Sequence, residues 1–205
     1  VTVSGDLLFI GSPYGESLSS SQAAGALYVY NANDFSLIKK LTSPNMQAGD
    51  NFGSSDISKC ISVSGNNLIV GSSGRNTQRG AVYVFTLDDL NATPTELTAY
   101  DGSDGDYFGV SVASTSEYII VGAFGHNANT TNDGAVYIYD INDLSAQPTK
   151  IDSPVNNQYA GFGRSVSATE DRIFLSARSY DTYVYSTSDL SLIQTLTNVD
   201  GFGFG

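Results

Sequence analysis

The stretch DYFGVSVASTSEYIIVGAF, residues 106–124, decides the fold because its parts recur along the chain. Its Phe-Gly step recurs at Phe52-Gly53, Phe108-Gly109, Phe162-Gly163 and Phe204-Gly205, positions that lie 56, 54 and 42 residues apart. Joining Gly205 to Val1 continues the pattern, so the 205 residues hold four whole repeats. A period of about 50 residues is typical of propellers and solenoids. We take the repeats as 1–53, 54–109, 110–163 and 164–205.

Each repeat predicts four short strands with turn signals between them. In the third repeat these strands are 110–115, 117–124, 134–141 and 147–154. The second and third strands are apolar on both faces, which fits a sheet buried between two neighbouring sheets. The sequence therefore predicts an all-β fold, a β-propeller or propeller segment of four four-stranded blades.

Residues that occur in every repeat are interpreted as structural, and residues that do not repeat as candidates for function. The turn after the third strand has an Asp in all four copies, at Asp34, Asp89, Asp143 and Asp189. An Asp side chain holds such a turn by accepting backbone N–H groups two residues on. The loops between the second and third strands, by contrast, differ in length and sequence, at 13–24, 73–79, 124–133 and 178–181. Variable loops that emerge on one side of a rigid scaffold are where binding is expected.

The charge narrows the choice of partners. The net charge is −12 and the sequence pI about 4.1. Nucleic acids and anionic membrane surfaces are disfavoured, because binding phosphate needs clustered Lys and Arg. No apolar run approaches the ~20 residues of a membrane-spanning helix, so membrane insertion is not expected. Cys60 is the only cysteine, which excludes an intrachain disulfide.

The repeats resemble the FG-GAP family, whose β-propeller repeats also form integrin α-subunit heads. Residues 97–139 are most similar, with a D-G-rich turn, then F-G-x-S-V, V-G-A and G-A-x-Y. The resemblance implies a ring of usually seven blades, of which this chain would be a truncated part, and the alternative is a propeller that four blades close by themselves. It also implies blades whose outer strands come from the neighbouring repeat. Integrin-type repeats often carry an Asp-x-Asp-x-Asp-Gly calcium loop, but the matching positions here read VSGDLL, VSGNNL, STSEYI and ATEDRI. Calcium, and any other cofactor, is therefore not expected.

Two further features are weighed as sites. Asp101, Asp104 and Asp106 form the densest acidic cluster and are a weak candidate for a hard cation, although a turn before Phe-Gly explains them better. His126 is the only histidine, and without a second His or a Cys it makes a poor metal site. The plainer interpretation of His126 is a solvated loop side chain. No catalytic motif is visible, so an enzyme is not expected.

The function predicted is non-catalytic: a binding or adhesion module, or a structural surface module, that displays its loops to a protein or glycan. The localisation that goes with it is extracellular, or the surface of a cell or virion. One alternative is an architectural component of an extracellular or virion assembly, built from copies of itself or other surface proteins. Another is a domain of a hydrolase that processes glycans or lipids. The candidate contact residues are the non-repeated loop residues Tyr14, Arg75, Arg79, Phe124, His126, Arg178 and Tyr180.

Overall fold

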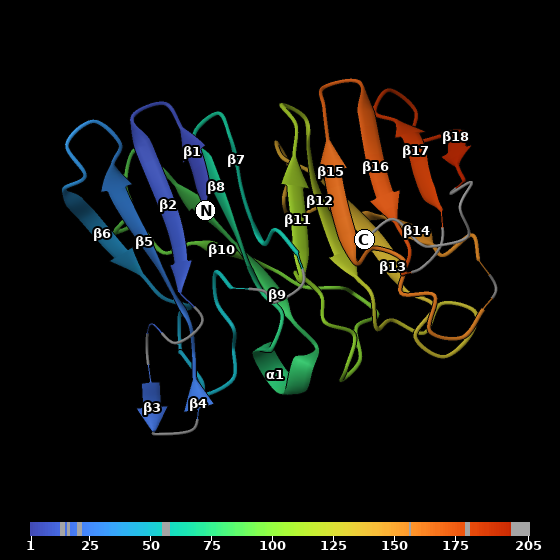
Figure 1. Cartoon of the computed structure of the whole chain (residues 1–205), viewed down its shortest axis with the longest axis horizontal. Helices are drawn as coiled ribbons and strands as arrows, with labels where there is room; N and C mark the ends of the chain where they lie inside the picture. Colours follow the sequence, from blue (N-terminus) through green and yellow to red (C-terminus); the bar gives the residue numbers. More distant parts are fainter. Residues whose placement is uncertain are drawn as a thin grey trace.

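The chain folds into four antiparallel sheets of four strands, one in each predicted repeat (Figure 1). This computed structural model describes residues 1–12, 15, 17–19, 22–54, 58–155, 157–178 and 181–197, without the side chains of 17–19 and 22–23. The predicted all-β propeller segment is confirmed.

The blades take their strands in chain order. Blade 1 consists of β1 (Thr2–Ser4), β2 (Leu7–Ser12), β5 (Ala26–Asn31) and β6 (Leu37–Leu41). Blade 2 consists of β7 (Ile61–Ser64), β8 (Asn67–Ser72), β9 (Ala81–Thr86) and β10 (Thr95–Leu97). Blade 3 consists of β11 (Ser111–Ser114), β12 (Tyr118–Ala123), β13 (Ala135–Asp140) and β14 (Thr149–Asp152). Blade 4 consists of β15 (Ser165–Ala168), β16 (Arg172–Ser176), β17 (Thr182–Ser186) and β18 (Leu192–Leu196).

Each blade is therefore a simple meander made from a single repeat. The implication that outer strands would come from a neighbouring repeat is wrong for this chain. The physical reason is that each strand is followed along the chain by the strand beside it, and consecutive strands joined by turns and loops of this length usually pair with each other. The first strands of the blades lie side by side, β7 between β1 and β11, and β11 between β7 and β15. The last strands, such as β6 and β18, lie at the outside (Figure 1).

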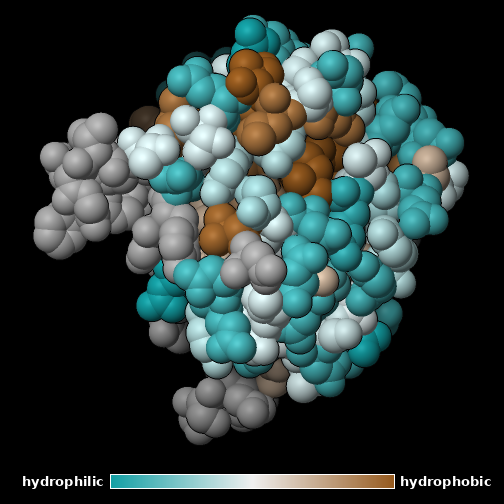
Figure 2. Space-filling model, turned by 90° about the vertical axis from the view of Figure 1, so that its right-hand side faces the viewer, coloured by the Kyte–Doolittle hydropathy of each residue, from teal (hydrophilic) through white to brown (hydrophobic). Residues whose placement is uncertain are grey.

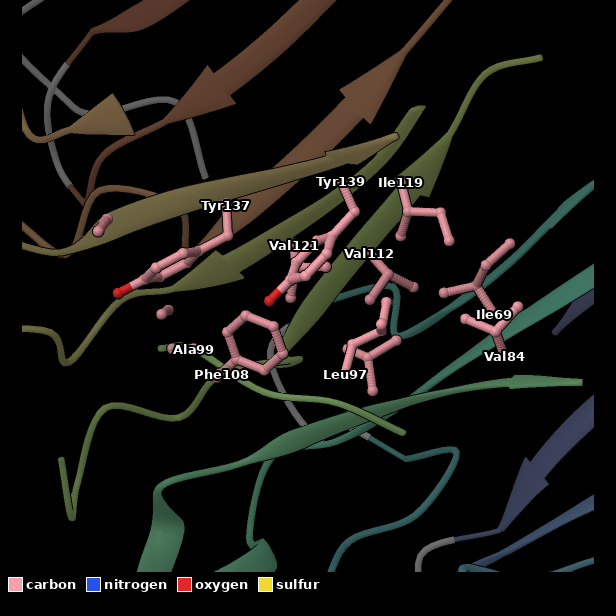
Figure 3. Close-up of a cluster of buried hydrophobic side chains, with 13 residues drawn as sticks. Ile69, Val84, Leu97, Ala99, Phe108, Val112, Ile119, Val121, Tyr137 and Tyr139 are labelled. Carbon is pink, nitrogen blue, oxygen red and sulfur yellow. The ribbon is translucent and has the colours of Figure 1, made fainter. Parts of the chain in front are cut away.

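Three apolar clusters fill the spaces between adjacent blades. The cluster between blades 2 and 3 contains Ile69 and Val84 from one side and Val121 and Tyr139 from the other (Figure 3). Equivalent clusters lie between blades 1 and 2 and between blades 3 and 4. Because strand side chains alternate between faces, blades 2 and 3 contribute one face to each of two clusters. This arrangement explains why their middle strands are apolar at nearly every position.

The Phe-Gly step joins each pair of blades. The rings of Phe52, Phe108 and Phe162 are fully buried, one in each cluster. Phe108 pairs with Gly80 at the start of the third strand of its own blade, in an isolated bridge. The next residue, Gly109, donates its N–H to the oxygen of Gly122 in blade 3, at 3.0 Å. We call this arrangement of ring, bridge and cross-blade hydrogen bond the Phe-Gly junction.

The two ends of the blades differ in character. At one end, uppermost in Figure 1, short hairpin turns join the strands. The repeated Asp residues hold these turns, as predicted: Asp34 accepts the N–H of Ser36 at 2.9 Å, and Asp143 accepts that of Ser145 at 3.2 Å. Hydrogen bonds from the hydroxyl and then the N–H of Ser36 hold the pKa of Asp34 below its usual value. This end is therefore a set of similar, locally stabilised turns, which we call the hairpin end.

The opposite end, which we call the loop end, carries the variable loops and the Phe-Gly turns. The first variable loop includes the small hairpin of β3 (Ser17–Ser19) and β4 (Gln22–Ala23). The second includes the single turn α1 (Arg75–Gln78), in which Asn76 and Thr77 have φ of 50° and 60°. No helix in the described part of the chain is long and apolar enough to cross a membrane.

We expect Phe108→Ala to lower the free energy of unfolding by about 3–5 kcal/mol, because it removes a fully buried ring and leaves a cavity. Chemical denaturation of the purified chain measures the change. Phe35→Ala is the control, since Phe35 is 70% exposed at the hairpin end and its loss should cost far less. Equal effects of the two substitutions would contradict the role given to the Phe-Gly junction.

A second expectation concerns Gly122 in β12. A Cβ there would overlap the backbone oxygen of Gly163 and the hydroxyl of Ser111, so Gly122→Ala should destabilise the chain by about 2–3 kcal/mol. At Gly5 a Cβ would meet nothing within 4 Å, and only the positive φ of 54° opposes substitution. Gly5→Ala should therefore cost about 1 kcal/mol. Thermal unfolding of both variants tests the difference, and a well-tolerated Gly122→Ala would disprove close blade contact there.

Candidate functional site

Several predicted site residues meet at the loop end, but two of them are buried in structural pairs. Arg75 lies in α1, and the carboxylate of Asp50 is 3.2 Å from its guanidinium. The two side chains are only 9% and 1% exposed. Asp50 also accepts hydrogen bonds from the Ser43 hydroxyl and the Gln47 N–H, at 2.8 and 2.9 Å. The expectation that Arg75 is displayed for contact is wrong, because it neutralises a buried acid.

His126 occupies the equivalent place in the next blade. Its Nδ1 lies 2.9 Å from Oδ2 of Asp106, and its Nε2 lies 3.1 Å from Nζ of Lys150. The Lys ammonium can only donate, so Nε2 accepts, and Nδ1–H donates to Asp106. The ring is 7% exposed, which contradicts the interpretation of a solvated loop histidine. Sequence reasoning missed the pair because Asp106 and His126 are 20 residues apart, although Asp50 and Arg75 have a similar spacing.

Asp101 and Lys150 extend this network toward solvent. Asp101 accepts hydrogen bonds from the Tyr137 hydroxyl at 2.6 Å and from Lys150 Nζ at 2.8 Å. Burial acts to raise the pKa of Asp101, but the hydrogen bonds from Lys150 and Tyr137 outweigh it, so the pKa lies below its usual value. Burial, and then the hydrogen bond to Asp101, raises the pKa of the Tyr137 phenol. Lys150 is also paired with Asp152, at 2.9 Å.

The three acids of the candidate cation cluster each have different partners. Asp101 binds Tyr137 and Lys150, and Asp106 binds His126 and the N–H of Ser103. Asp104 lies 3.3 Å from Arg79, with both side chains about half exposed or more. In the described ranges, no three His, Cys, Asp or Glu side chains are grouped to hold a metal ion. Only the hydrogen bond from the Ser103 N–H to Asp106 is a turn contact, and the other contacts join these acids to side chains far away in the sequence.

One buried acid was not singled out from the sequence. Asp133 is fully buried at the end of the third variable loop. Its carboxylate accepts the N–H groups of Ala128, Asn129 and Thr130, at 2.8, 2.8 and 3.0 Å. It therefore fixes the course of the loop that carries Phe124 and His126. The only sequence signal is its position directly before Gly134.

The exposed part of the loop end is an aromatic and cationic surface between blades 3 and 4. The rings of Phe124 and Tyr107 are stacked, with centroids 4.9 Å apart and planes at 15°. The guanidinium of Arg164 lies over the Phe124 ring, 5.7 Å from its centroid. A Cβ at Gly161 would lie 3.4 Å from the Cβ of Arg178 and 3.9 Å from the Phe124 ring.

We call this surface the loop-end patch. Its members are Tyr107, Phe124, Arg164 and Arg178, together with the neighbouring Tyr159, whose backbone oxygen lies 3.9 Å from the same Cβ position at Gly161. Tyr159 is 59% exposed and Arg178 is exposed, whereas Tyr107, Phe124 and Arg164 are half-buried and hold each other in place. The structure thus brings together Phe124 and Arg178 from the predicted set. Tyr107, Tyr159 and Arg164 were not predicted, because they lie in the Phe-Gly turns rather than the variable loops.

The other predicted residues divide as follows. Arg79 lies at the end of α1, where its backbone oxygen accepts the N–H of Phe108, next to Tyr107 of the loop-end patch, and its side chain is in the exposed pair with Asp104. Tyr14 and Tyr180 lie outside the described residues, as do Phe204 and Gly205. Cys60 is buried, and this burial raises the pKa of its thiol to about 12, which keeps it unreactive at neutral pH.

Comparison with known proteins agrees with this architecture. The model of the FG-GAP repeat family matches residues 35–85 and 94–139, and each match spans one Phe-Gly junction with the strands on both sides. The chain therefore carries FG-GAP repeats at these residues. No curated protein matches the sequence.

Two solved structures illustrate the fold. A chain in a crystal structure of the mitotic checkpoint complex is 13% identical, with a TM-score of 0.60, and the match covers 94% of this chain and 48% of that one. The computationally designed Ika8 protein is 14% identical, with a TM-score of 0.58, and the match covers 95% and 47%. The chain thus spans about half the length of these structures. Identities this low show the fold alone.

The lowered pKa of Asp101 gives an expected pH dependence. A carboxyl whose pKa is lower in the folded state stabilises that state above its unfolded pKa of about 3.9, and the contribution is lost as the pH falls through the folded pKa. The free energy of unfolding of Asp101→Asn should therefore decline less between pH 6 and pH 3 than that of the unaltered chain. Urea titrations across this range measure it. Asp104→Asn, at a side chain 61% exposed, is the control and should follow the unaltered profile. Parallel profiles for all three chains would refute the conclusion that the Asp101 carboxylate stabilises the folded state.

Proposed function

We propose that this chain is a non-catalytic binding module that uses the loop-end patch to contact a protein partner. The FG-GAP repeats and the propeller fold support a binding or structural module, and the patch is the feature that supports a particular surface. The supporting observation is that exposed Tyr and Arg side chains gather on loops that a rigid blade frame holds in place. Aromatic and Arg side chains are those most often found at the centre of protein interfaces.

The distribution of arginines also supports the loop end as the binding surface. The chain carries −12 overall, yet four of its five arginines lie at the loop end, namely Arg75, Arg79, Arg164 and Arg178. Arg75 is buried, which leaves three that face solvent at least in part. Arg79 is paired with the exposed Asp104, so a partner with acidic groups would be attracted to Arg164 and Arg178 in the loop-end patch.

The contacts of the ionisable groups at the loop end favour a non-catalytic role. His126 and Asp106 bind each other, Arg75 binds Asp50, and Asp133 binds backbone N–H groups. These are structural tasks that keep the groups from acting on a substrate. We place the module outside the cell, or on the surface of a cell or virion, in line with the FG-GAP repeats. A glycan partner and a hydrolase domain are the competing functions.

Matched double variants test the proposal. The loop-end variant is Tyr159→Ala with Arg178→Ala, and the hairpin-end control is Phe35→Ala with Arg172→Ala. Phe35 is 70% exposed and the Arg172 side chain 43% exposed, so both variants remove one exposed aromatic ring and one arginine. Circular dichroism first establishes that both variants fold.

Partners captured with the unaltered chain are then purified and titrated against all three chains by isothermal calorimetry. We expect the loop-end variant to weaken binding at least about tenfold and the control to leave it unchanged. A partner that binds the loop-end variant normally would disprove this surface. Glycan-array binding lost in the same variant would favour the glycan alternative, and turnover of a glycan or lipid ester would favour the hydrolase.

A further inference from the structure

We propose that His126 is a proton-operated switch, in which protonation of Nε2 breaks its hydrogen bond with Lys150 and replaces it with an ion pair to Asp101. The proposal concerns the chain itself and does not depend on the partner of the loop-end patch. It follows from the positions of one histidine, one lysine and two aspartates, which lie on three different segments of the chain.

His126 is buried, and both of its ring nitrogens have a charged neighbour. The residue is 7% exposed, and Asp106, whose Oδ2 lies 2.9 Å from Nδ1, is 2% exposed. A buried carboxylate needs hydrogen-bond donors, and those of Asp106 are the Nδ1–H group and the N–H of Ser103. Nδ1 therefore keeps its proton in both charge states of the ring, and any change of charge takes place at Nε2.

Lys150 occupies the place at which a second proton would bind. Its Nζ lies 3.1 Å from Nε2 of His126 and is also bonded to Asp101 and Asp152, at 2.8 and 2.9 Å. Burial acts to lower the pKa of Lys150, but the hydrogen bonds to Asp101 and Asp152 outweigh it, so the pKa lies above its usual value. The ammonium therefore stays charged and donates a proton to the lone pair of Nε2. This contact exists only while the imidazole is neutral.

A proton on Nε2 turns this hydrogen bond into a repulsion. The imidazolium N–H and the ammonium are both donors and both positive, so they cannot remain 3.1 Å apart. Asp101 is the acceptor within reach, because its Oδ2 already lies 3.7 Å from Nε2. Lys150 keeps Asp152, whose side chain is 50% exposed, as its partner. In this second arrangement His126 and Lys150 each have an acidic partner.

Other ionisable groups near the ring belong to β13 and to the turn that precedes the Phe-Gly junction. The Tyr137 ring lies edge-on to His126, with centroids 6.1 Å apart, and its hydroxyl donates to Asp101 at 2.6 Å. Burial raises the pKa of the Tyr137 phenol, which keeps it neutral. Asp104 is turned to Arg79, 3.3 Å away. Among these kinds of side chain, only an imidazole ordinarily changes charge between about pH 5 and pH 8.

Solvent reaches the switch from the side of Lys150 and Asp101. Their side chains are 16% and 30% exposed, whereas the Asp106 side chain that closes the Nδ1 side is 2% exposed. On the side of the molecule seen in Figure 2, the surface toward the loop end is mainly hydrophilic, and apolar side chains gather nearer the hairpin end. A proton can therefore exchange at Nε2 without separation of the blades.

The switch connects three segments that shape the loop end. His126 lies in the third variable loop, two residues after Phe124 of the loop-end patch, whereas Lys150 lies in β14. Asp101 lies in the turn before the Phe-Gly junction and also holds Tyr137, whose ring belongs to the cluster between blades 2 and 3 and whose hydroxyl points out of it (Figure 3). Protonation therefore changes how the third variable loop is tied to this turn and to β14.

Nitrogen NMR of the only histidine tests both states in the unaltered chain. At about pH 8 the neutral ring is expected to carry its proton on Nδ1, with Nε2 as the acceptor. As the pH is lowered to about 5, Nε2 should gain a proton while Nδ1 keeps its own. A neutral ring protonated on Nε2 would overturn the proposal. So would a ring that keeps the same charge over the whole range.

Two lysine variants test the opposing charge. Lys150→Met removes the ammonium beside Nε2, so the ring should gain its proton at a pH about one unit higher than in the unaltered chain. Lys39→Met is the matched control, because Lys39 bonds Asn91 in another blade contact and carries the same charge. It should leave the titration of the ring unchanged. Equal shifts in the two variants would reflect net charge alone and would contradict the switch.

Asp101→Asn tests the partner of the protonated ring. Loss of this carboxylate should move the protonation of His126 to lower pH, opposite to the effect of Lys150→Met. Asp104→Asn, which removes an acid of the same turn that is paired with Arg79, is the control. If Asp101→Asn titrates like this control, the ion pair to Asp101 does not form and the proposal is wrong.

Hydrogen exchange tests whether the change of contacts reaches the third variable loop. Amide protection of residues 124–133, corrected for the intrinsic effect of pH, should differ between about pH 8 and pH 5 in the unaltered chain. In His126→Gln, which cannot gain a proton at this site, the difference should be absent. The same difference in both chains would show that the ring does not control the loop. Thermal unfolding verifies that the variants fold, and the NMR test of the unaltered chain requires no substitution.

Discussion

The Phe-Gly junction is the interaction on which the rest of the structure depends. A blade of four short strands has two apolar faces and cannot bury both by itself. The Phe ring fills the space between two blades, and the Gly that follows turns the chain so that its N–H reaches the next blade. One dipeptide thus connects packing to hydrogen bonding at each blade contact. The repeat length is the length of chain needed to build one blade and return to this point.

At the loop end, equivalent positions of successive repeats carry different buried pairs of charged or polar side chains. The acid that precedes Phe-Gly is Asp50 in one repeat and Asp106 in the next, and its buried partner is Arg75 or His126. In the third repeat the equivalent position is Ala160, and an acid is absent there. Where the acid is missing, the surrounding surface carries Arg178 and Tyr159 exposed to solvent. The repeat that departs from the pattern is therefore where the loop-end patch forms.

The exposure of apolar residues in the two end blades has the same cause as their burial in the interior blades, namely the number of neighbouring blades. Interior blades bury both faces because each has two neighbours, and the end blades carry the same residues with only one neighbour. Leu196 is apolar because the repeat pattern places an apolar residue there, and it remains exposed because no described blade covers it. An exposed repeat face of this kind is a contact surface for another blade.

The sequence by itself determined the repeats, the strands and the blades, because strand periodicity, Gly and Asx turns act over a few neighbouring residues. It also determined the structural role of Asp34 and Asp143 in their turns. Only the tertiary structure decided which loop residues are available for contact. Arg75 and His126 looked exposed because they lie in polar loops, but their acidic partners come from turns 20 or more residues away. Pairing of this kind depends on how blades pack in space, and neither composition nor spacing encodes it locally.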